Sequence, residues 1–573
     1  MFKTFFRKIK KRLNLFQPAG KKYQDINPED IFIDSTNLPG FEEHRFEGRI
    51  ERPMNPTTFT VIKIVLIILI FALISKLWIL NINQGSLYAR ISENNRLEHT
   101  LIFADRGLIY DRNMIELATN AVKSDTSDFA GRLYPPIQGL SHVVGYLKYP
   151  LSDQTGVYYE EYYRGRDGVE RVYDDLLRGK NGLKLKETDV AGNTISESVI
   201  RKPIDGGSVV LSIDARLTEV LYMAISSLAD DRGFVGGTAV IMDVRTGEII
   251  ALTSFPEYDQ NLLTAGSDRT TINLLLNSSS NPFLNRAISG LYTPGSILKP
   301  IIALAALNEG IISPDKKILS TGSITVKNPY NPSRPSIFKD WKAHGWTDMR
   351  EAIAVSSDTY FYSIGGGFGD QKGLGITALD KYFQLFALTE KTGIELLGES
   401  KGVIPTPEWK KEQFNGEIWR LGDTYITAIG QYGTQITPLN AVRFVSAIAN
   451  GGKILTPSIL LDYNPIPVER TIEFKDEDWR VVREGMRASV IYGTASGLNV
   501  PYVKAAAKTG TAEVGSVKLF VNSWSVGFFP FDNPKYAWAI VMERGPSSNT
   551  LGATSVIRQL FDWMAIHTPE YFE

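Results

Sequence analysis

Ser296 and Lys299 are the first residues whose types and spacing suggest chemistry. Thr293-Pro294-Gly295 just before them is a turn signal. The apolar run Ile297–Leu307 is long enough for a buried helix, so Ser296 is expected at a helix start and Lys299 one turn later on the same face. A serine needs a neighbouring base before it attacks a carbonyl, and a partly desolvated lysine can serve as that base. We therefore predict that Ser296 is a nucleophile.

The serine–lysine spacing alone is a weak signal, because it occurs twice more. Ser313 precedes Lys316 and Ser336 precedes Lys339 at the same spacing. Ser313 is interpreted as the cap of another element, and Ser336 as part of a loop rich in proline and asparagine. Only Ser296 combines a turn before it with a sustained apolar stretch after it.

A second polar motif, Ser356 and Asp358, follows a stretch with helical character at Met349–Val355. A similar string at Ser279–Asn281 lies upstream of Ser296 in a polar segment. Short strings of this kind are common, so the motif gains meaning only from its place after Ser296.

A third motif, Lys508-Thr509-Gly510-Thr511, follows small residues that allow a close backbone approach. Two strand-like stretches follow at 521–530 and 536–543, which predicts an antiparallel meander with the Lys508 segment at its edge. A second Lys-Thr-Gly string at Lys391–Gly393 is interpreted as a turn that ends a helix.

The composition describes a globular protein of several units. The chain has 573 residues, 43% of them hydrophobic and 22% charged, which is too long for one core and too apolar for disorder. A net charge of -1 neither favours nor excludes nucleic acid, and the basic residues concentrate near the N-terminus. The absence of cysteine excludes disulfides, thiol catalysis and cysteine metal sites.

The N-terminal region predicts a membrane anchor. Met1–Phe16 alternates basic and apolar residues, which favours an anionic membrane surface over a nucleic-acid tail. Phe59–Leu80 is almost wholly apolar and long enough to span a bilayer, whereas the competing interpretation is a buried helix of a soluble core. Positive residues stay inside, so we expect a retained signal anchor with a cytoplasmic N-terminus.

The rest of the sequence, from residue 81 onward, indicates two modules. Residues 81–205 mix short strands with glycine turns and lack the spacing of a catalytic or metal site. After Gly206-Gly207, a strand at 209–214, a helix at 217–228 and a hairpin over 238–253 predict a sheet with helices packed on it.

Together, Ser296-x-x-Lys299, Ser356-x-Asp358 and Lys508–Thr511 resemble, in order and type, the penicillin-binding transpeptidases and serine β-lactamases. Phe338–Trp341 and the segment around Ser356 are similar to elongation-type members (penicillin-binding protein 2-like) of class B. Further strings extend the resemblance from about residue 57 to the end: Arg106–Gly107, Gly168–Glu170, Asn285–Ile288, Gly422–Thr424, Ile429–Gln431, Thr437–Leu439 and Gly493–Ala495.

The resemblance implies an α+β penicillin-binding transpeptidase fold, with an antiparallel sheet flanked by helices and a helical subdomain. It adds an elongated mixed α/β pedestal and one N-terminal transmembrane helix. The expected domains are a cytoplasmic basic tail (1–58), a signal anchor (59–80), a pedestal or dimerisation-like domain (81–205) and a transpeptidase domain (206–573).

The resemblance also implies roles in D,D-transpeptidation. Ser296 attacks the penultimate D-Ala of a stem peptide, Lys299 accepts its proton, and Ser356 relays that proton to the leaving amine. Asp358 replaces the asparagine more usual in the family, and Lys508 supplies positive charge. Thr509, Gly510 and Thr511 bind the substrate, and the N–H groups of Ser296 and Thr511 form an oxyanion hole.

The implied partners are peptidoglycan stem peptides, β-lactams, a SEDS-family (RodA-like) glycosyltransferase, elongation-complex scaffold proteins and the bacterial plasma membrane. No nucleic acid, cofactor or metal is expected; some relatives bind a structural metal through a cysteine, which this chain lacks, and His344 is interpreted as an ordinary loop histidine. The competing hypotheses are a division-type transpeptidase, a scaffold for a glycosyltransferase, a soluble β-lactamase and a β-lactam receptor. The anchor and pedestal argue against a β-lactamase, and the short polar N-terminal segment against a receptor.

Overall fold

The computed structural model describes residues 56–573 except 89–96, 124–126, 155, 189–193, 329–330, 332, 462–467 and 516–518. The chain divides into two compact units, residues 1–94 and residues 95–573. The basic segment at Met1–Phe16 lies outside the described residues.

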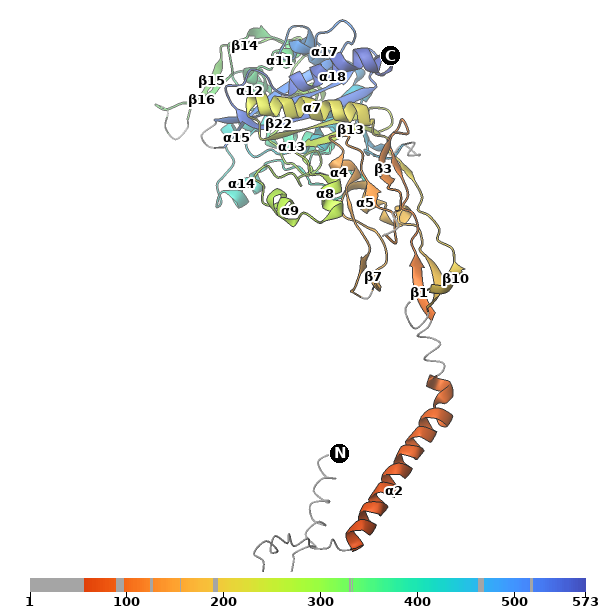
Figure 1. The fold of residues 1–573 in the computed structure, drawn as a ribbon. Helices are drawn as coiled ribbons and strands as arrows, with labels where there is room; N and C mark the ends of the chain where they lie inside the picture. Colours follow the sequence, from red (N-terminus) through yellow and green to blue (C-terminus); the bar gives the residue numbers. More distant parts are fainter. Residues whose placement is uncertain are drawn as a thin grey trace, which may run out of the picture. The chain divides into compact units, whose positions relative to one another are not determined.

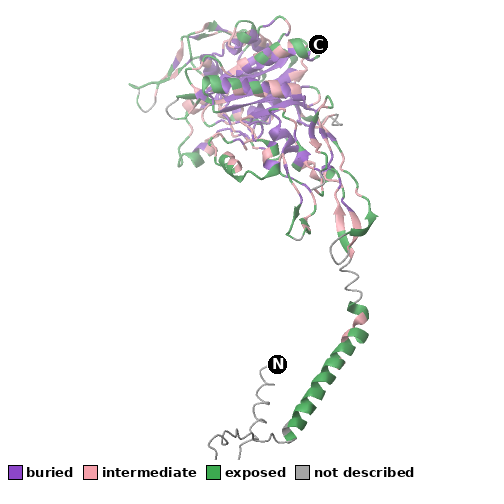
Figure 2. Ribbon diagram, viewed as in Figure 1, coloured by how far each residue is buried: buried purple, intermediate pink, exposed green. Residues whose placement is uncertain are grey.

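The first unit contains the expected apolar helix. Helix α2 (Pro56–Trp78) continues into the π-helical turn η4 (Ile79–Asn83). Among the described residues, Phe59–Asn83 is the one helix that is long and apolar enough to cross a membrane. Its apolar side chains are exposed all round, as Figure 2 shows in green. An all-round apolar helix of this length is what a bilayer requires, so the expected span is confirmed as a helix.

The N-terminal part of the second unit, residues 97–210, is built from short strands (Figure 1). An antiparallel sheet has the order β1-β9-β10, and a second sheet has the order β11-β2-β3-β4. The first comprises β1 (Leu97–Ile102), β9 (Gly182–Thr188) and β10 (Thr194–Arg201). The second comprises β2 (Ile109–Tyr110), β3 (Glu116–Asn120), β4 (Arg132–Leu133) and β11 (Val209–Val210). The remaining elements are α4 (Ser141–Val144), β5 (Leu147–Lys148), β6 (Leu151–Ser152), β7 (Tyr158–Glu160), β8 (Arg164–Gly165), α5 (Gly168–Val172) and α6 (Asp174–Leu177).

A five-stranded antiparallel sheet of order β13-β12-β22-β21-β20 organises the rest. Its strands are β12 (Gly236–Asp243), β13 (Ile249–Phe255), β20 (Ala506–Val514), β21 (Phe520–Phe529) and β22 (Tyr536–Pro546). The hairpin over 238–253 and the C-terminal meander are confirmed, with Lys508 on the edge strand. Every residue of β12 is buried, because helices cover both faces of the sheet.

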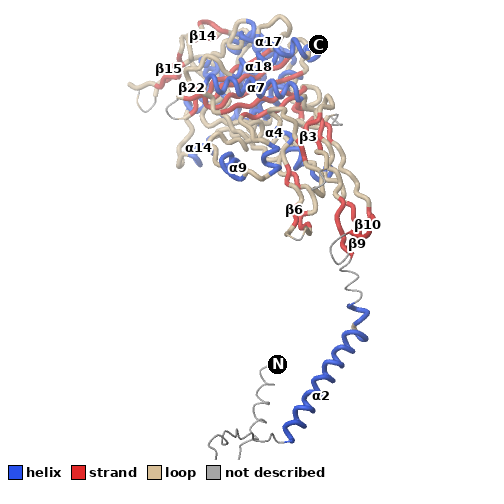
Figure 3. Tube along the Cα trace, viewed as in Figure 1, coloured by secondary structure: helices blue, strands red, loops and turns tan. Residues whose placement is uncertain are grey.

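The two faces of this sheet are covered by different helices. Helices α7 (Ala215–Arg232) and α18 (Ala553–His567) pack on one face (Figures 1 and 3). Helix α16 (Pro438–Asn450) packs on the other. Successive strand residues point to opposite faces, so Ala239 and Ile241 join the α7 core while Val240 and Met242 join the α16 core.

A largely helical region lies on the α16 side of the sheet and contains the second motif. It contains α10 (Lys299–Asn308), α11 (Met349–Ala354), α12 (Asp358–Gly366), α13 (Gly375–Leu385), α14 (Pro407–Gln413), α15 (Leu421–Thr427) and α17 (Asp476–Ile491). Helices α8 (Gln260–Ala265) and α9 (Arg269–Leu276), and the 3₁₀ turns η5 (Gly295–Leu298), η6 (Ser496–Leu498) and η7 (Pro569–Phe572), complete the helical set. The mixed α+β architecture with a helical subdomain is as expected from the sequence.

The helical region also contains small two-stranded ladders, and one of them shows that the loop expected at Ser336–Lys339 is a strand. Ser336–Lys339 was expected in a loop, but it forms strand β16 and pairs with β15 (Ser323–Val326). The other ladders pair β14 (Ile318–Ser320) with β17 (Gly345–Thr347), and β18 (Lys453–Leu455) with β19 (Val468–Thr471).

Candidate active site

The segment around Ser296 forms a tight turn wedged between two other elements. Ser296 lies in the 3₁₀ turn η5, directly before α10, which confirms a helix start at this residue. The Gly295 N–H donates to the Gly430 carbonyl (2.9 Å). On the other side, a Cβ at Gly510 would lie 2.8 Å from the Pro294 carbonyl oxygen. Strand β20 therefore packs directly against the turn, and a glycine at 510 is what permits this approach.

The structure brings Lys299 to the second motif. The buried Lys299 amine donates to the Ser356 carbonyl (2.8 Å), the Ser356 hydroxyl (3.2 Å) and Asp358 Oδ1 (2.6 Å). Within the described part of the chain, none of its hydrogen bonds goes to the Ser296 hydroxyl. Asp358 is thus the charge partner of Lys299, a role that the sequence did not predict.

Ser356 occupies an unusual backbone conformation between two helices. Its φ is 58°, which is uncommon for a residue with a side chain. Helix α11 ends two residues earlier, and Ser357 caps α12 by accepting a hydrogen bond from the Tyr360 N–H. Backbone strain of this kind persists where the surroundings fix it, and it clusters at functional sites.

Lys508 completes the centre from the edge strand. Its buried amine donates to the Ser356 hydroxyl (2.8 Å) and to the Thr509 carbonyl (3.0 Å). Burial, together with the nearby charge of Lys299, holds the pKa of Lys508 well below its ordinary value, although Asp358 opposes the shift. The Ser356 hydroxyl therefore lies between two lysine amines, one of which is biased toward its neutral form.

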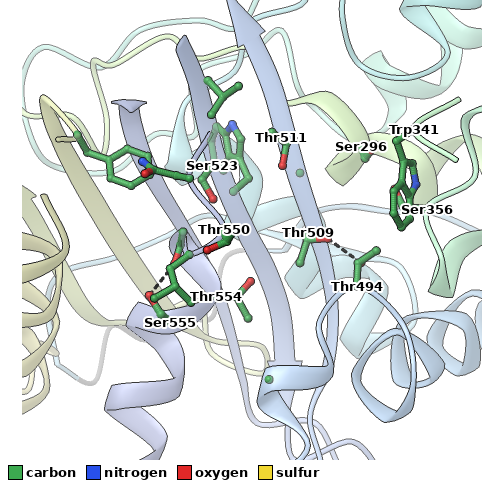
Figure 4. Close-up of a pocket in the computed structure, with 18 of the residues that line it drawn as sticks. Ser296, Trp341, Ser356, Thr494, Thr509, Thr511, Ser523, Thr550, Thr554 and Ser555 are labelled. Carbon is green, nitrogen blue, oxygen red and sulfur yellow. Dashed lines mark hydrogen bonds between the residues drawn. The ribbon is translucent and has the colours of Figure 1, made fainter. Parts of the chain in front are cut away.

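A cleft of about 730 Å³ opens above this centre. Six of the eight predicted site residues line this cleft. The other two, Lys299 and Lys508, do not line it but donate hydrogen bonds to the Ser356 hydroxyl. Figure 4 shows Ser296, Ser356 and Trp341 on one side of strand β20, which carries Thr509 and Thr511. The six lining residues are Ser296, Ser356, Asp358, Thr509, Gly510 and Thr511. The competing serines Ser313 and Ser336 do not line it.

Several lining residues were not predicted. Thr494 accepts a hydrogen bond from the Thr509 hydroxyl (2.7 Å; Figure 4), and the exposed Trp341 forms part of the wall. Both lie in strings that supported the family resemblance, but neither string suggested a role. Beyond β20 the wall is rich in hydroxyl groups, from Ser523, Thr550, Thr554 and Ser555. The described residues contain no group of three or more His, Asp or Glu side chains placed to hold a metal.

The arrangement supports nucleophilic acyl transfer. A serine at the start of a helix, a second serine flanked by two amines, and an edge strand with hydroxyls meet at one cleft. Backbone N–H groups of the turn and of the edge strand are the usual donors for a developing oxyanion.

Comparison with known families agrees with this geometry. Residues 237–562 match the penicillin binding protein transpeptidase domain, and residues 122–211 match the penicillin-binding protein dimerisation domain. The peptidoglycan D,D-transpeptidase MrdA of Acinetobacter baumannii is 32% identical over 461 residues, which are 75% of this chain and 66% of the relative. The chain thus spans about two thirds of the length of this relative.

Two similar solved structures are complexes. The complex between penicillin-binding protein PBP2 and MreC from Helicobacter pylori contains a chain with a TM-score of 0.67 and 26% identity, and the match covers 82% of this chain and 98% of that one. A structure described as coordinating polymerization and crosslinking by a peptidoglycan synthase complex gives a TM-score of 0.68 and 26% identity, covering 88% and 98%.

Proposed function

This chain belongs to the penicillin-binding protein family, and from that membership we propose that it is an elongation-type peptidoglycan D,D-transpeptidase. The observation that carries the proposal is the Ser356 hydroxyl held between the amines of Lys299 and Lys508 at the cleft that contains Ser296. The similarity to MrdA and to PBP2 supports the elongation type over the division type.

The proposed reaction starts with attack of Ser296 on the carbonyl of the penultimate D-Ala of a stem peptide. The serine proton passes to the basic centre formed by Lys299, Ser356 and Lys508, and the N–H groups of Ser296 and Thr511 stabilise the oxyanion. The peptide bond breaks, terminal D-Ala leaves with a proton delivered through Ser356, and an acyl-enzyme ester remains on Ser296. An amine of a second stem peptide then displaces Ser296 and forms the cross-link.

Substrate binding is assigned to the edge strand. The hydroxyls of Thr509 and Thr511 hold the terminal carboxylate of the donor peptide. The negative charge of the bound carboxylate favours the ammonium form of Lys508, which then contributes positive charge to the complex. Gly510 allows strand β20 to pack closely against the turn that carries Ser296. A β-lactam would acylate Ser296 by the same attack and leave slowly.

The proposed setting is the bacterial plasma membrane. The chain crosses it once, with a cytoplasmic tail (1–58), an anchor (59–80), a pedestal (81–205) and an extracytoplasmic transpeptidase domain (206–573). The basic N-terminal segment supports this orientation. The complexes of the relatives support an elongation scaffold protein and a SEDS-family glycosyltransferase as partners.

A peptide assay tests the reaction directly. The full-length chain in detergent, given a stem peptide ending in D-Ala-D-Ala, should release D-Ala, and a Ser296→Ala variant should release none. Wild-type protein that releases no D-Ala from donor and acceptor peptides together would contradict the enzymatic proposal and favour a scaffold. In cells, depletion that produces filaments rather than rounded cells would contradict the elongation role.

A further inference from the structure

Asp340 is a buried carboxylate behind the second motif. Its Oδ2 atom accepts hydrogen bonds from the Ser357 hydroxyl (2.9 Å) and the Thr359 N–H (2.9 Å). These two residues flank Asp358, the charge partner of Lys299. The carboxylate of Asp340 has no solvent exposure. A single carboxylate therefore binds the side chain of the residue before Asp358 and the backbone N–H of the residue after it.

The rest of its surroundings fix Asp340 itself. Oδ2 also accepts from the Ser320 hydroxyl (3.2 Å), and Oδ1 accepts from the Trp341 N–H (2.9 Å). The buried His344 ring lies 3.4 Å from Oδ1. Burial alone would raise the pKa of Asp340. Hydrogen bonds from the backbone N–H groups of Thr359 and Asp358 and from the Ser357 hydroxyl, together with the charge of Lys299, hold it below its ordinary value. The group is thus a carboxylate with a full set of partners.

Trp341, which follows Asp340 in the sequence, contacts the residue before Ser356. The Trp341 indole N–H donates to the Val355 carbonyl (3.3 Å), and the same side chain lines the cleft. Asp340 and Trp341 therefore contact Val355, Ser357 and Thr359, which bracket Ser356. Ser356 has a positive φ that needs such support.

We propose that Asp340 is a positioning residue for acyl transfer: by binding Ser357 and Thr359 it keeps Ser356 and Asp358 within hydrogen-bonding distance of Lys299. Asp340 does not touch the reacting atoms, and it acts through the second motif. This role rests on the proposed function and adds to it a residue from the connection between β16 and β17.

The test is acylation of the full-length chain in detergent by a fluorescent penicillin over a range of concentrations. Asp340→Asn cannot satisfy both the Trp341 N–H and the donors on Oδ2 without turning its amide against one of them. We expect the limiting acylation rate at saturating penicillin to fall about 10- to 100-fold, while the concentration for half-saturation stays within about 3-fold. Ser357→Ala removes one of the bonds to Asp340 together with the cap of α12. The Thr359 N–H still binds Asp340, so the limiting rate should fall by a smaller factor, about 3- to 10-fold.

The matched control is Glu399→Gln. Glu399 is also a buried carboxylate that accepts backbone N–H bonds, from Thr392 (2.6 Å) and Gly393 (3.3 Å), but it does not line the cleft. Its variant should acylate at the wild-type rate even if its melting temperature falls as far as that of Asp340→Asn.

Three results would overturn the positioning role: a wild-type limiting rate in Asp340→Asn, a change confined to half-saturation, or an equal loss in Glu399→Gln. If Asp340→Asn does not fold, Ser357→Ala decides, and a wild-type limiting rate there overturns the role. A wild-type chain that is not acylated would overturn the proposed function itself. Acylated wild type with an equally fast Asp340→Asn overturns the positioning role alone.

Discussion

Two lysine amines flank one serine hydroxyl at the centre of the proposed site. Lys299 has a carboxylate partner in Asp358 at 2.6 Å, whereas Lys508 donates its hydrogen bonds to neutral oxygens of Ser356 and Thr509. Burial and like charge both disfavour the ammonium form of Lys508. The two lysines thus differ in environment: Lys299 has a charged partner, and the surroundings of Lys508 favour its neutral form.

This difference predicts a pH-dependent contribution to stability. The native pKa of Lys508 is below its unfolded value of 10.5, so between the two values the unfolded chain binds more protons and stability rises with pH. In Lys508→Met this gain is absent. Guanidinium unfolding of both proteins in detergent at pH 7, 8 and 9 should show the wild type gaining stability over the variant as the pH rises, by about 1 kcal/mol per pH unit at most. Parallel pH profiles would contradict the lowered pKa.

The sequence revealed most of these residues, but not how they pair. Motif order placed Ser296, Ser356 and Lys508 at one site, because types and spacing are local properties of the chain. Lys299 was expected to serve Ser296, and only the packing of α10 on α12 shows its contact with Asp358. Asp340 has no local signal for its role, since its partners Ser357 and Thr359 are reached only through the fold.

At the scale of elements, the turn η5, which carries the proposed nucleophile Ser296, lies between strand β20 and the turn at Gly430. A Cβ at Gly430 would lie 2.1 Å from the Gly295 carbonyl oxygen, and the φ of Gly430 is +74°. Trp524 of β21 donates its indole N–H to the Thr293 carbonyl (2.9 Å), so the sheet also fixes the entry to the turn. The position of Ser296 thus depends on close backbone approaches from two directions.

Gly430→Ala should therefore impair both stability and acylation. Overpacking and an unfavourable φ together predict a loss of about 2–5 kcal/mol in the free energy of unfolding, and at least about a tenfold slower reaction with penicillin. The control is Gly416→Ala, since Gly416 has a similar φ of +86° but a Cβ there meets nothing within 4 Å. It should cost about 1–2 kcal/mol and leave the acylation rate unchanged. Equal effects of the two substitutions would contradict the proposed wedge.

Element types were predictable where the apolar period was strong, as in α7, the β12–β13 hairpin and the C-terminal meander. The β15–β16 ladder was missed because its strands are short, β16 is largely exposed, and the sequence between the strands is polar. An exposed two-stranded ladder leaves little hydrophobic pattern in the sequence.

At the scale of the whole second unit, the N-terminal part and the catalytic part share a core. Ile109, Leu117 and Val143 belong to the same buried cluster as Ile301 of α10 and Phe444 of α16. Within the N-terminal part, the fully buried Glu170 pairs with Arg106 (2.6 Å) and Arg132 (2.7 Å). Glu170 lies in a string that resembles the family. The sequence alone does not show that its side chain pairs with Arg106 and Arg132 in the interior.

Removing the negative charge of Glu170 should lower the free energy of unfolding. Glu170→Gln removes the carboxylate from the buried Arg132 and leaves Arg106 with Asp174 alone (2.7 Å). We therefore expect a loss of about 3 kcal/mol in guanidinium unfolding. Glu160→Gln breaks a solvent-exposed pair with Arg164 (2.7 Å) and should cost at most about 1 kcal/mol. A similar small loss in both variants would show that the buried network does not stabilise the fold.

The most direct test of the proposed reaction is covalent labelling of the full-length chain by a fluorescent penicillin. Wild type, Ser313→Ala and Ser336→Ala should all become labelled, because neither competing serine lines the cleft. Ser296→Ala should remain unlabelled, since it has no nucleophile at the start of α10. Labelling of Ser296→Ala at the wild-type level would contradict the assignment of Ser296 as the acylated residue.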